Sequence, residues 1–112
     1  MSIINAKIDE IAEGYVNEAK TDYVGLWQIC IRVRKEFNST NPQQLRELVF
    51  QVIRRMLASG LQAVTLHSSG PGCTPWNEQE TDEVIKRISS EWDALGHDPS
   101  VADIVWFNNP SG

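Results

Sequence analysis

The stretch Asn41–Gly60 reads NPQQLRELVFQVIRRMLASG and contains the clearest helix of the chain. Asn41 is a favourable N-cap residue, and the fixed φ of Pro42 suits the first helical position. Gly60 follows the last apolar residue, where a left-handed residue commonly ends a helix. Apolar residues recur between these signals at helical spacing: Leu45, Leu48, Val49, Val52, Ile53, Met56 and Leu57. Such a wide apolar face predicts the most central helix of the fold, running from Pro42 to about Ser59.

Two more helices are predicted ahead of this one. The first lies between Ile4 and Ala19, where one apolar stripe repeats at spacings of three and four: Ile4, Ile8, Ile11, Tyr15 and Ala19. The second is capped by Thr21 and Asp22 and continues through Phe37. Its buried side is formed by Tyr23, Leu26, Cys30, Val33 and Phe37, with Trp27 and Ile29 flanking them.

The sequence from Leu61 onward predicts a short sheet and a fourth helix. Leu61–Leu66 is a candidate strand, and His67–Pro75 is rich in Ser, Gly and Pro, which predicts a loop. A helix follows from about Asn77 to Leu95 and is ended by Gly96. Its buried stripe is Val84, Ile85, Ile88, Trp92 and Leu95. The apolar segment Val101–Phe107 is a second candidate strand that could pair with Leu61–Leu66.

These elements predict a mainly α fold, a four-helix domain with a small two-stranded β element. No repeat or linker divides the chain, so residues 1–112 are expected to form a single domain. Hydrophobic residues make up 41% of the sequence, and Trp27, Trp92 and Trp106 are expected in the core. The order of elements resembles a winged-helix arrangement, which is an analogy of fold and carries no function by itself.

Charge and cysteine content narrow the functional classes. The formal net charge is −5, which disfavours nucleic acid as a partner and favours a basic protein, although acidity also simply aids solubility. Cys30 and Cys73 do not suggest a disulfide framework, so we expect free thiols in a reducing cytoplasm. No apolar run is long enough to predict a membrane span.

Residues able to carry chemistry are few and scattered. His67 and His97 do not stand at a metal-ligand spacing from a Cys or a carboxylate. Cys73 has no base or orienting group that spacing alone identifies. The run Ser68–Gly72 lacks the lysine of a phosphate-binding loop. The sequence therefore predicts neither an enzyme nor a cofactor or metal site.

The most distinctive segment is an acidic turn that follows an isolated tryptophan. Four acids occur within six residues, Glu78, Glu80, Asp82 and Glu83, and Trp76 precedes them. The acids could simply complement the dipole of the fourth helix. They could also surround Trp76 as a half-exposed anchor for a basic partner, or Trp76 could fold back onto the helix start. We predict these five residues as the partner-binding site.

DNA binding is the alternative function. The basic residues are Arg32, Arg34, Lys35, Arg46, Arg54 and Arg55 in the second and third helices. At 100° per residue Arg46, Arg54 and Arg55 point in different directions, as expected for ordinary solvated helix faces. The order of elements alone supports a winged-helix-like regulator that binds DNA or another regulator.

Scattered aromatic, Gly and Pro positions carry a family resemblance. They are Leu26-Trp27-Gln28, Gly60-Leu61, Pro75-Trp76, Glu91-Trp92, Asp98-Pro99 and Asp103-Ile104-Val105-Trp106-Phe107. In these the chain resembles a group of small uncharacterised bacterial proteins, some of which resemble immunity proteins of contact-dependent growth inhibition and related polymorphic toxin systems. The resemblance implies a cytoplasmic inhibitor that binds a cognate toxin domain, frequently a nuclease, and acts by occlusion without catalytic residues.

Overall fold

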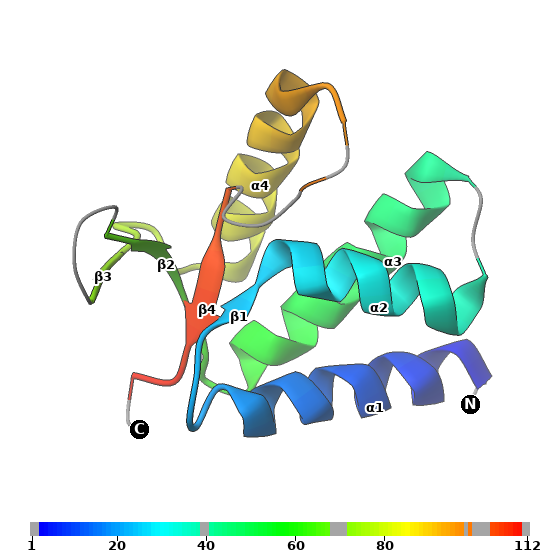
Figure 1. Cartoon of the computed structure of the whole chain (residues 1–112), viewed down its shortest axis with the longest axis horizontal. Coiled ribbons are helices and arrows are strands. Elements are labelled where there is room, and N and C mark those ends of the chain that lie inside the picture. The colour runs from blue at the N-terminus through cyan, green and yellow to red at the C-terminus, as the bar shows by residue number, and fades with distance from the viewer. Residues whose placement is uncertain (1–2, 39–40, 68–71, 98, 100–103, 111–112) are drawn as a thin grey trace.

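The described residues of the computed structural model, 3–38, 41–67, 72–97, 99 and 104–110, form four helices and four short strands (Figure 1). The helices are α1 (Ile3–Glu18), α2 (Leu26–Phe37), α3 (Pro42–Ala58) and α4 (Thr81–Leu95). The strands are β1 (Val24–Gly25), β2 (Gln62–Leu66), β3 (Cys73–Pro75) and β4 (Trp106–Asn108). The predicted class, mainly α with a small β element, is confirmed.

Helix α3 is the central helix, as its wide apolar face predicts. It packs against α1, α2 and α4. Its start is capped as expected, because Asn41 Oδ1 accepts hydrogen bonds from the backbone N–H groups of Gln43 and Gln44 at 2.9 and 3.2 Å. Six of its apolar side chains are buried: Leu45, Leu48, Val49, Val52, Ile53 and Met56. None of the helices in the described part of the chain is long and apolar enough to cross a membrane.

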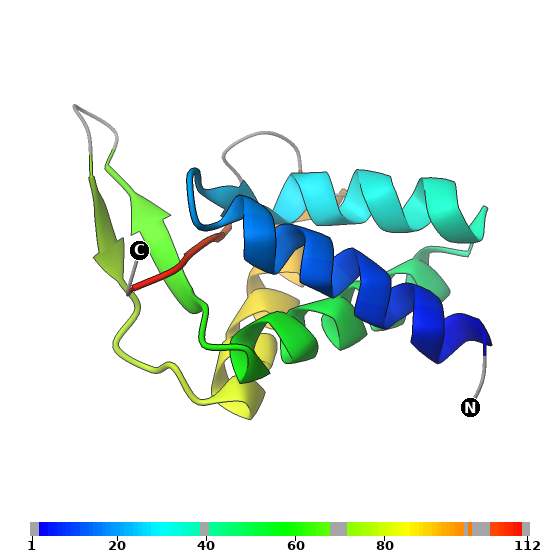
Figure 2. The ribbon, with the colours of Figure 1, turned by 90° about the horizontal axis from the view of Figure 1, so that it is seen from below.

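The sheet is larger than the two-stranded element predicted from the sequence. Among the described residues its strand order is β1-β4-β2-β3, with antiparallel pairing throughout. The expected pairing of Leu61–Leu66 with the C-terminal segment is confirmed, since Ala63 lies opposite Phe107. Residues 100–103 of the expected strand lie outside the described residues. Figure 2 shows the sheet at one end of the group formed by α1, α2 and α3.

Strands β1 and β3 were not predicted from the sequence, and they change the bounds of one predicted helix and one predicted loop. The second helix does not begin at Thr21 and Asp22, because Val24 and Gly25 pair with Phe107 and Trp106 before α2 starts at Leu26. The end of the predicted loop His67–Pro75 is strand β3, which pairs with Thr65 and its neighbours on β2. In both places pairing with a distant strand outweighs the local preference for a cap or a loop.

The fourth helix also begins later than predicted. It starts at Thr81 instead of about Asn77, so Glu78 and Glu80 precede the helix. Residues 76–80 form the connection between β3 and α4, called here the β3–α4 connection. At the other end Gly96 adopts the predicted left-handed conformation, with φ of +77°.

One main hydrophobic core joins the helices to one face of the sheet. Trp92 is buried in it as predicted, whereas Trp27 and Trp106 are only half-buried. These two rings approach Gly25 so closely that the space a side chain would need there is already filled. Ile4 departs from its expected place on the buried stripe of α1, since half of its surface is exposed.

Candidate functional site: a groove beside helix α4

The β3–α4 connection is held against strand β2 by the side chain of Gln79. Its Oε1 accepts a hydrogen bond from the backbone N–H of Ala63 at 2.9 Å. Its Nε2 donates to the carbonyl oxygens of Ala63 at 2.9 Å and Trp76 at 2.8 Å. The amide of Gln79 therefore continues the hydrogen bonding of the sheet beyond β3. Sequence reasoning missed Gln79, because its partner is the backbone of a distant strand and no local pattern marks it.

Trp76 is buried under an arginine. Its side chain is 5% exposed and belongs to the main core. The indole Nε1 donates a hydrogen bond to Thr65 Oγ1 at 3.0 Å. The guanidinium carbon of Arg87 lies 3.7 Å from the ring centroid, so it covers one face of the indole. The interpretation of Trp76 as a half-exposed anchor is therefore wrong. The ring lies against Thr65 of β2 and beneath Arg87, in the middle of α4, so the alternative of a contact with the helix start stays a prediction.

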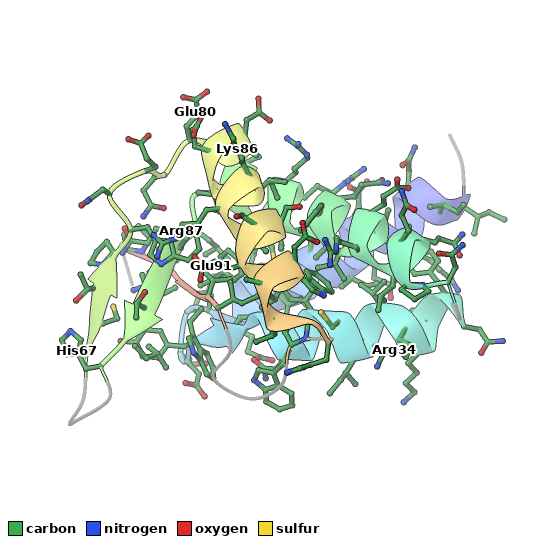
Figure 3. The ribbon with its side chains drawn as sticks, turned by 90° about the horizontal axis from the view of Figure 1, so that it is seen from above. Arg34, His67, Glu80, Lys86, Arg87 and Glu91 are labelled. Carbon is green, nitrogen blue, oxygen red and sulfur yellow. The ribbon has the colours of Figure 1, made fainter. Side chains whose placement is uncertain are left out.

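A groove of about 560 Å³ runs between the β3–α4 connection and helix α4, and is called here the α4 groove. Its lining includes Trp76, Glu78, Glu83, Lys86, Arg87 and Glu91. Glu83, Arg87 and Glu91 are spaced by four residues and therefore share one face of α4. Figure 3 shows Arg87 and Glu91 on the side of α4 toward the strands, with Lys86 and Glu80 near the start of the helix.

The structure brings only some of the predicted acids together. Glu78, on the β3–α4 connection, and Glu83, on α4, both line the α4 groove. Glu80 is exposed just before the helix and is outside that lining. Asp82 turns toward α3, where it accepts a hydrogen bond from Arg54 Nη1 at 2.8 Å. Within the described ranges, no cation lies within ion-pair distance of Glu78, Glu80 or Glu83.

Arg87 is the main cation of the groove and is already engaged. Its Nε donates to Glu91 Oε2 at 2.7 Å, while its guanidinium stacks on Trp76. The side chains of Arg87 and Glu91 are 50% and 38% exposed. The α4 groove therefore contains one ion pair over the Trp76 ring, two further carboxylates and the ammonium group of Lys86.

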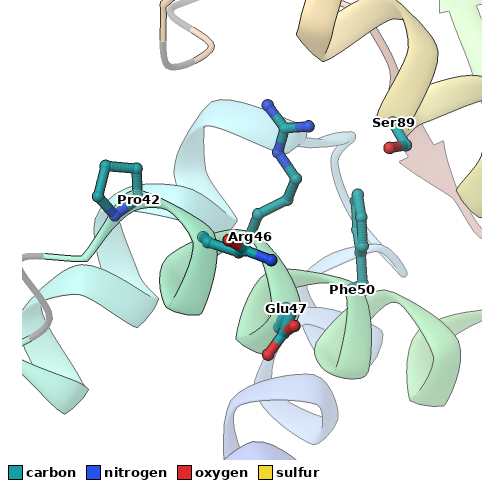
Figure 4. A pocket seen from close by; sticks show the side chains of 6 residues that line it. Pro42, Arg46, Glu47, Phe50 and Ser89 are labelled. Carbon is teal, nitrogen blue, oxygen red and sulfur yellow. The ribbon is translucent and has the colours of Figure 1, made fainter.

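The arginines of α3, predicted to be solvated, pair instead with carboxylates of neighbouring helices. Arg46 pairs with Asp93 and lies over the Trp92 ring, and Arg54 pairs with Asp82, both on α4. Arg55 pairs with Asp9 on α1. Figure 4 shows Arg46 and Phe50 rising on the side of α3 toward α4, around a hollow of about 450 Å³.

The cysteines and histidines lie apart from the α4 groove. Both thiols are free, with Cys30 buried and Cys73 half-buried on β3. Asn108 Nδ2 approaches Cys73 Sγ at 3.8 Å, and a hydrogen bond with that thiol raises the pKa of Tyr23. His67 Nε2 lies 3.1 Å from Thr74 Oγ1. In the part of the chain that the structure describes, no three His, Cys, Asp or Glu side chains gather as a set of metal ligands.

Comparison of the chain with protein-family models, with curated proteins and with solved structures finds no match. The geometry and charge of the α4 groove are therefore the basis for assigning a function.

Proposed function

We propose that this protein binds a basic partner protein through the α4 groove, and that the partner is a toxin domain which it neutralises by occlusion in the cytoplasm. The observation that carries the proposal is that Glu78 and Glu83 line one groove and have no ion-pair partner among the described residues. A basic side chain that enters this groove would meet two carboxylates.

The rigidity of the groove supports this function. Glu78 stands on a connection fixed by three hydrogen bonds of the Gln79 amide, and Glu83 stands on helix α4. The backbone at both positions is fixed before binding, so the conformational entropy lost when a partner arrives is mainly that of the two exposed side chains. Their charge also attracts a basic partner over a distance and accelerates encounter at low salt.

The toxin as partner follows from the family resemblance and the acidity of the chain. A net charge of −5 suits a basic toxin such as a nuclease. Inhibition by occlusion requires only a stable interface over the toxin's active surface. The described residues of the α4 groove supply carboxylates and an indole ring for such an interface.

DNA binding, the alternative function, has one observation in its favour: the hairpin β2–β3 follows α2 and α3, as in winged-helix proteins. Its difficulty is that Arg46, Arg54 and Arg55 pair with carboxylates on α4 and α1. Binding phosphates with these arginines would break those pairs and bring the acidic partners close to the DNA backbone. A gel-shift assay at low salt is expected to show no complex with duplex DNA, and a shifted band would favour the regulator.

The proposed function is tested with two double variants of equal charge. Glu78→Lys/Glu83→Lys reverses both of these charges in the groove, and Glu10→Lys/Glu13→Lys makes the same charge change on the exposed side of α1. The partner tested is the protein encoded immediately upstream, and the association rate is measured by surface plasmon resonance at low and high salt. We expect the groove variant to associate about tenfold more slowly at low salt, and the α1 variant to change by less than about threefold.

Two results would contradict the proposal. Equal slowing by both variants would mean that net charge matters and the groove does not. If the wild-type chain forms no stable complex with the upstream product, and that product is not toxic, the assignment as a toxin inhibitor is wrong.

A further inference from the structure

We infer that the face of Trp76 beneath Arg87 is a recognition site for an arginine side chain of the partner, and that Arg87 is an internal stand-in which the partner's guanidinium replaces. This inference rests on the proposed function, because it names the group that enters the α4 groove. It identifies the partner's chemistry as an exposed arginine flanked by basic surface.

Within the chain, Arg87 already makes the contacts that we propose for the partner's arginine. The guanidinium carbon of Arg87 lies 3.7 Å from the centroid of the indole, and Arg87 Nε donates to Glu91 at 2.7 Å. An aromatic face and a carboxylate placed together are the two features that bind guanidinium groups in proteins. A lysine ammonium is a compact, strongly hydrated point charge and cannot stack in this way, so the site favours arginine.

Arg87 can leave the ring without disturbing the ring's position. Trp76 is held independently, by Thr65 at the indole nitrogen, by Ala63 at its backbone N–H and by Gln79 at its carbonyl. Arg87, by contrast, is half-exposed, and its partner Glu91 is also partly solvated. Long exposed side chains change rotamer within picoseconds to nanoseconds, so the indole face is uncovered without backbone motion.

A second carboxylate is available to Arg87 when it moves away. Glu83 lies four residues before Arg87 and has no ion pair among the described residues, whereas Glu91 lies four residues after it. A glutamate four residues N-terminal to a cation is the favourable orientation on a helix. When Arg87 turns from Glu91 to Glu83, Glu91 and the Trp76 face become free together, and the incoming guanidinium finds both. Glu78 and Glu91 are then the two carboxylates of the groove left to the partner.

The test uses the isolated full chain and N-acetyl-arginine amide as the probe, with the neutral isostere N-acetyl-citrulline amide as its control. Binding is followed by NMR through the indole N–H signal of Trp76, which is assigned by its absence in Trp76→Phe. We expect Arg87→Ala to bind the arginine probe at least about fivefold more tightly than the wild type, because the internal competitor is gone. Lys35→Ala, which removes one cation from the exposed side of α2 outside the groove and leaves Arg87 on the ring, is expected to bind as the wild type does.

The inference is overturned if the arginine probe does not move the Trp76 signal in a folded Arg87→Ala chain, or if citrulline moves it equally. Arg87→Ser also removes the guanidinium from the Trp76 ring, and it replaces Arg87→Ala in the test if the alanine variant does not fold. A toxin complex that forms while the probe fails to bind would overturn this inference and leave the proposed function intact. Probe binding without any toxin complex would support the arginine site and count against the proposed function.

Discussion

Among single residues, Gln79 fixes the position of Glu78, because the hydrogen bonds of its side-chain amide hold the neighbouring backbone. It accepts from the N–H of Ala63, and it donates to the carbonyl of Trp76 and to that of Ala63, which also accepts from the N–H of Trp76. A side-chain amide is suited to this place because it offers a donor and an acceptor on one rigid plane. The acidic residues around it supply charge, but their position depends on this neutral side chain.

Replacement of Gln79 by alanine should therefore destabilise the fold and loosen the groove. The change leaves the partly buried N–H of Ala63 without a partner, so we expect a loss of about 2 kcal/mol in the free energy of unfolding. Urea denaturation measures the loss. Gln43→Ala, in the exposed first turn of α3, is the control and should change stability by less than about 0.5 kcal/mol. Equal effects of the two changes would refute the structural role given to Gln79.

Tyr15 gives the fold a dependence on alkaline pH. Its hydroxyl donates to the carbonyl oxygen of Gln28 at 3.0 Å, and burial raises its pKa from 10.0 to about 12. Between these values the unfolded chain loses the phenolic proton while the folded chain keeps it. The folded state then binds more protons, so the stability contributed by Tyr15 is complete below pH 10.0 and declines as the pH rises toward about 12.

Comparison with Tyr15→Phe isolates this effect. At neutral pH the variant should lose about 1 kcal/mol, the net value of one hydrogen bond. The advantage of the wild type over the variant should shrink across the alkaline window, since phenylalanine does not titrate. Urea unfolding of both proteins at a series of alkaline pH values measures it. A constant difference throughout would show that the Tyr15 hydroxyl does not titrate differently in the two states.

At the scale of elements, the helices and the pair β2 and β4 could be predicted from the sequence, whereas strands β1 and β3 could not. A helix of 12 to 17 residues repeats its apolar stripe several times, as α2 and α3 do. Strands β1 and β3 have two and three residues, too few to display any period. Their pairing partners are far away in the sequence, so no local signal reveals them.

The candidate site was predictable to a similar degree. Glu78 and Glu83 could be found because they stand in an acidic run beside an isolated tryptophan. The cover of Arg87 over Trp76 and the pairing of Asp82 with Arg54 could not be found. These contacts depend on how α4 is rotated against the sheet and against α3, which is fixed by packing of the whole core.

Two glycine positions in neighbouring elements should respond in opposite ways to the same substitution. In Gly25→Ala the new Cβ would lie 2.7 Å from the Trp27 ring and 3.0 Å from the Trp106 ring, so we expect a loss of about 1 to 3 kcal/mol. Gly14 lies inside α1 with nothing within 4 Å of a Cβ, and Gly14→Ala should gain about 0.5 to 1 kcal/mol. Thermal unfolding of both variants measures the two signs. A stabilising Gly25→Ala would mean that the two tryptophan rings pack differently.

At the scale of the whole molecule, strand β4 joins parts of the chain that otherwise do not pair. It lies between β1, which leads into α2, and β2, which follows α3. Phe107 is fully buried in this strand, opposite Val24 on one side and Ala63 on the other. The fold thus depends on a short segment that follows all four described helices in the sequence.

Phe107→Ala should accordingly be among the most damaging single changes. Loss of a large buried ring costs about 3 to 5 kcal/mol, a substantial fraction of the stability of a small domain. Pro110→Ala, at an exposed position just beyond the strand, should change stability by less than about 0.5 kcal/mol. Circular dichroism during urea unfolding measures both. A mild effect of Phe107→Ala would mean that the helices are stable without the sheet.

The central place of β4 also has a consequence for synthesis in the cell. During translation the helical segments emerge while β1 and β2 still lack the strand that lies between them. Until β4 is made, the edges of β1 and β2 are therefore unpaired in the nascent polypeptide. These edges include Val24 and Ala63, which are both fully buried once the fold is complete. Folding finishes after β4 has been synthesised. Until then, the unpaired edges of β1 and β2 are the surface that a chaperone would cover.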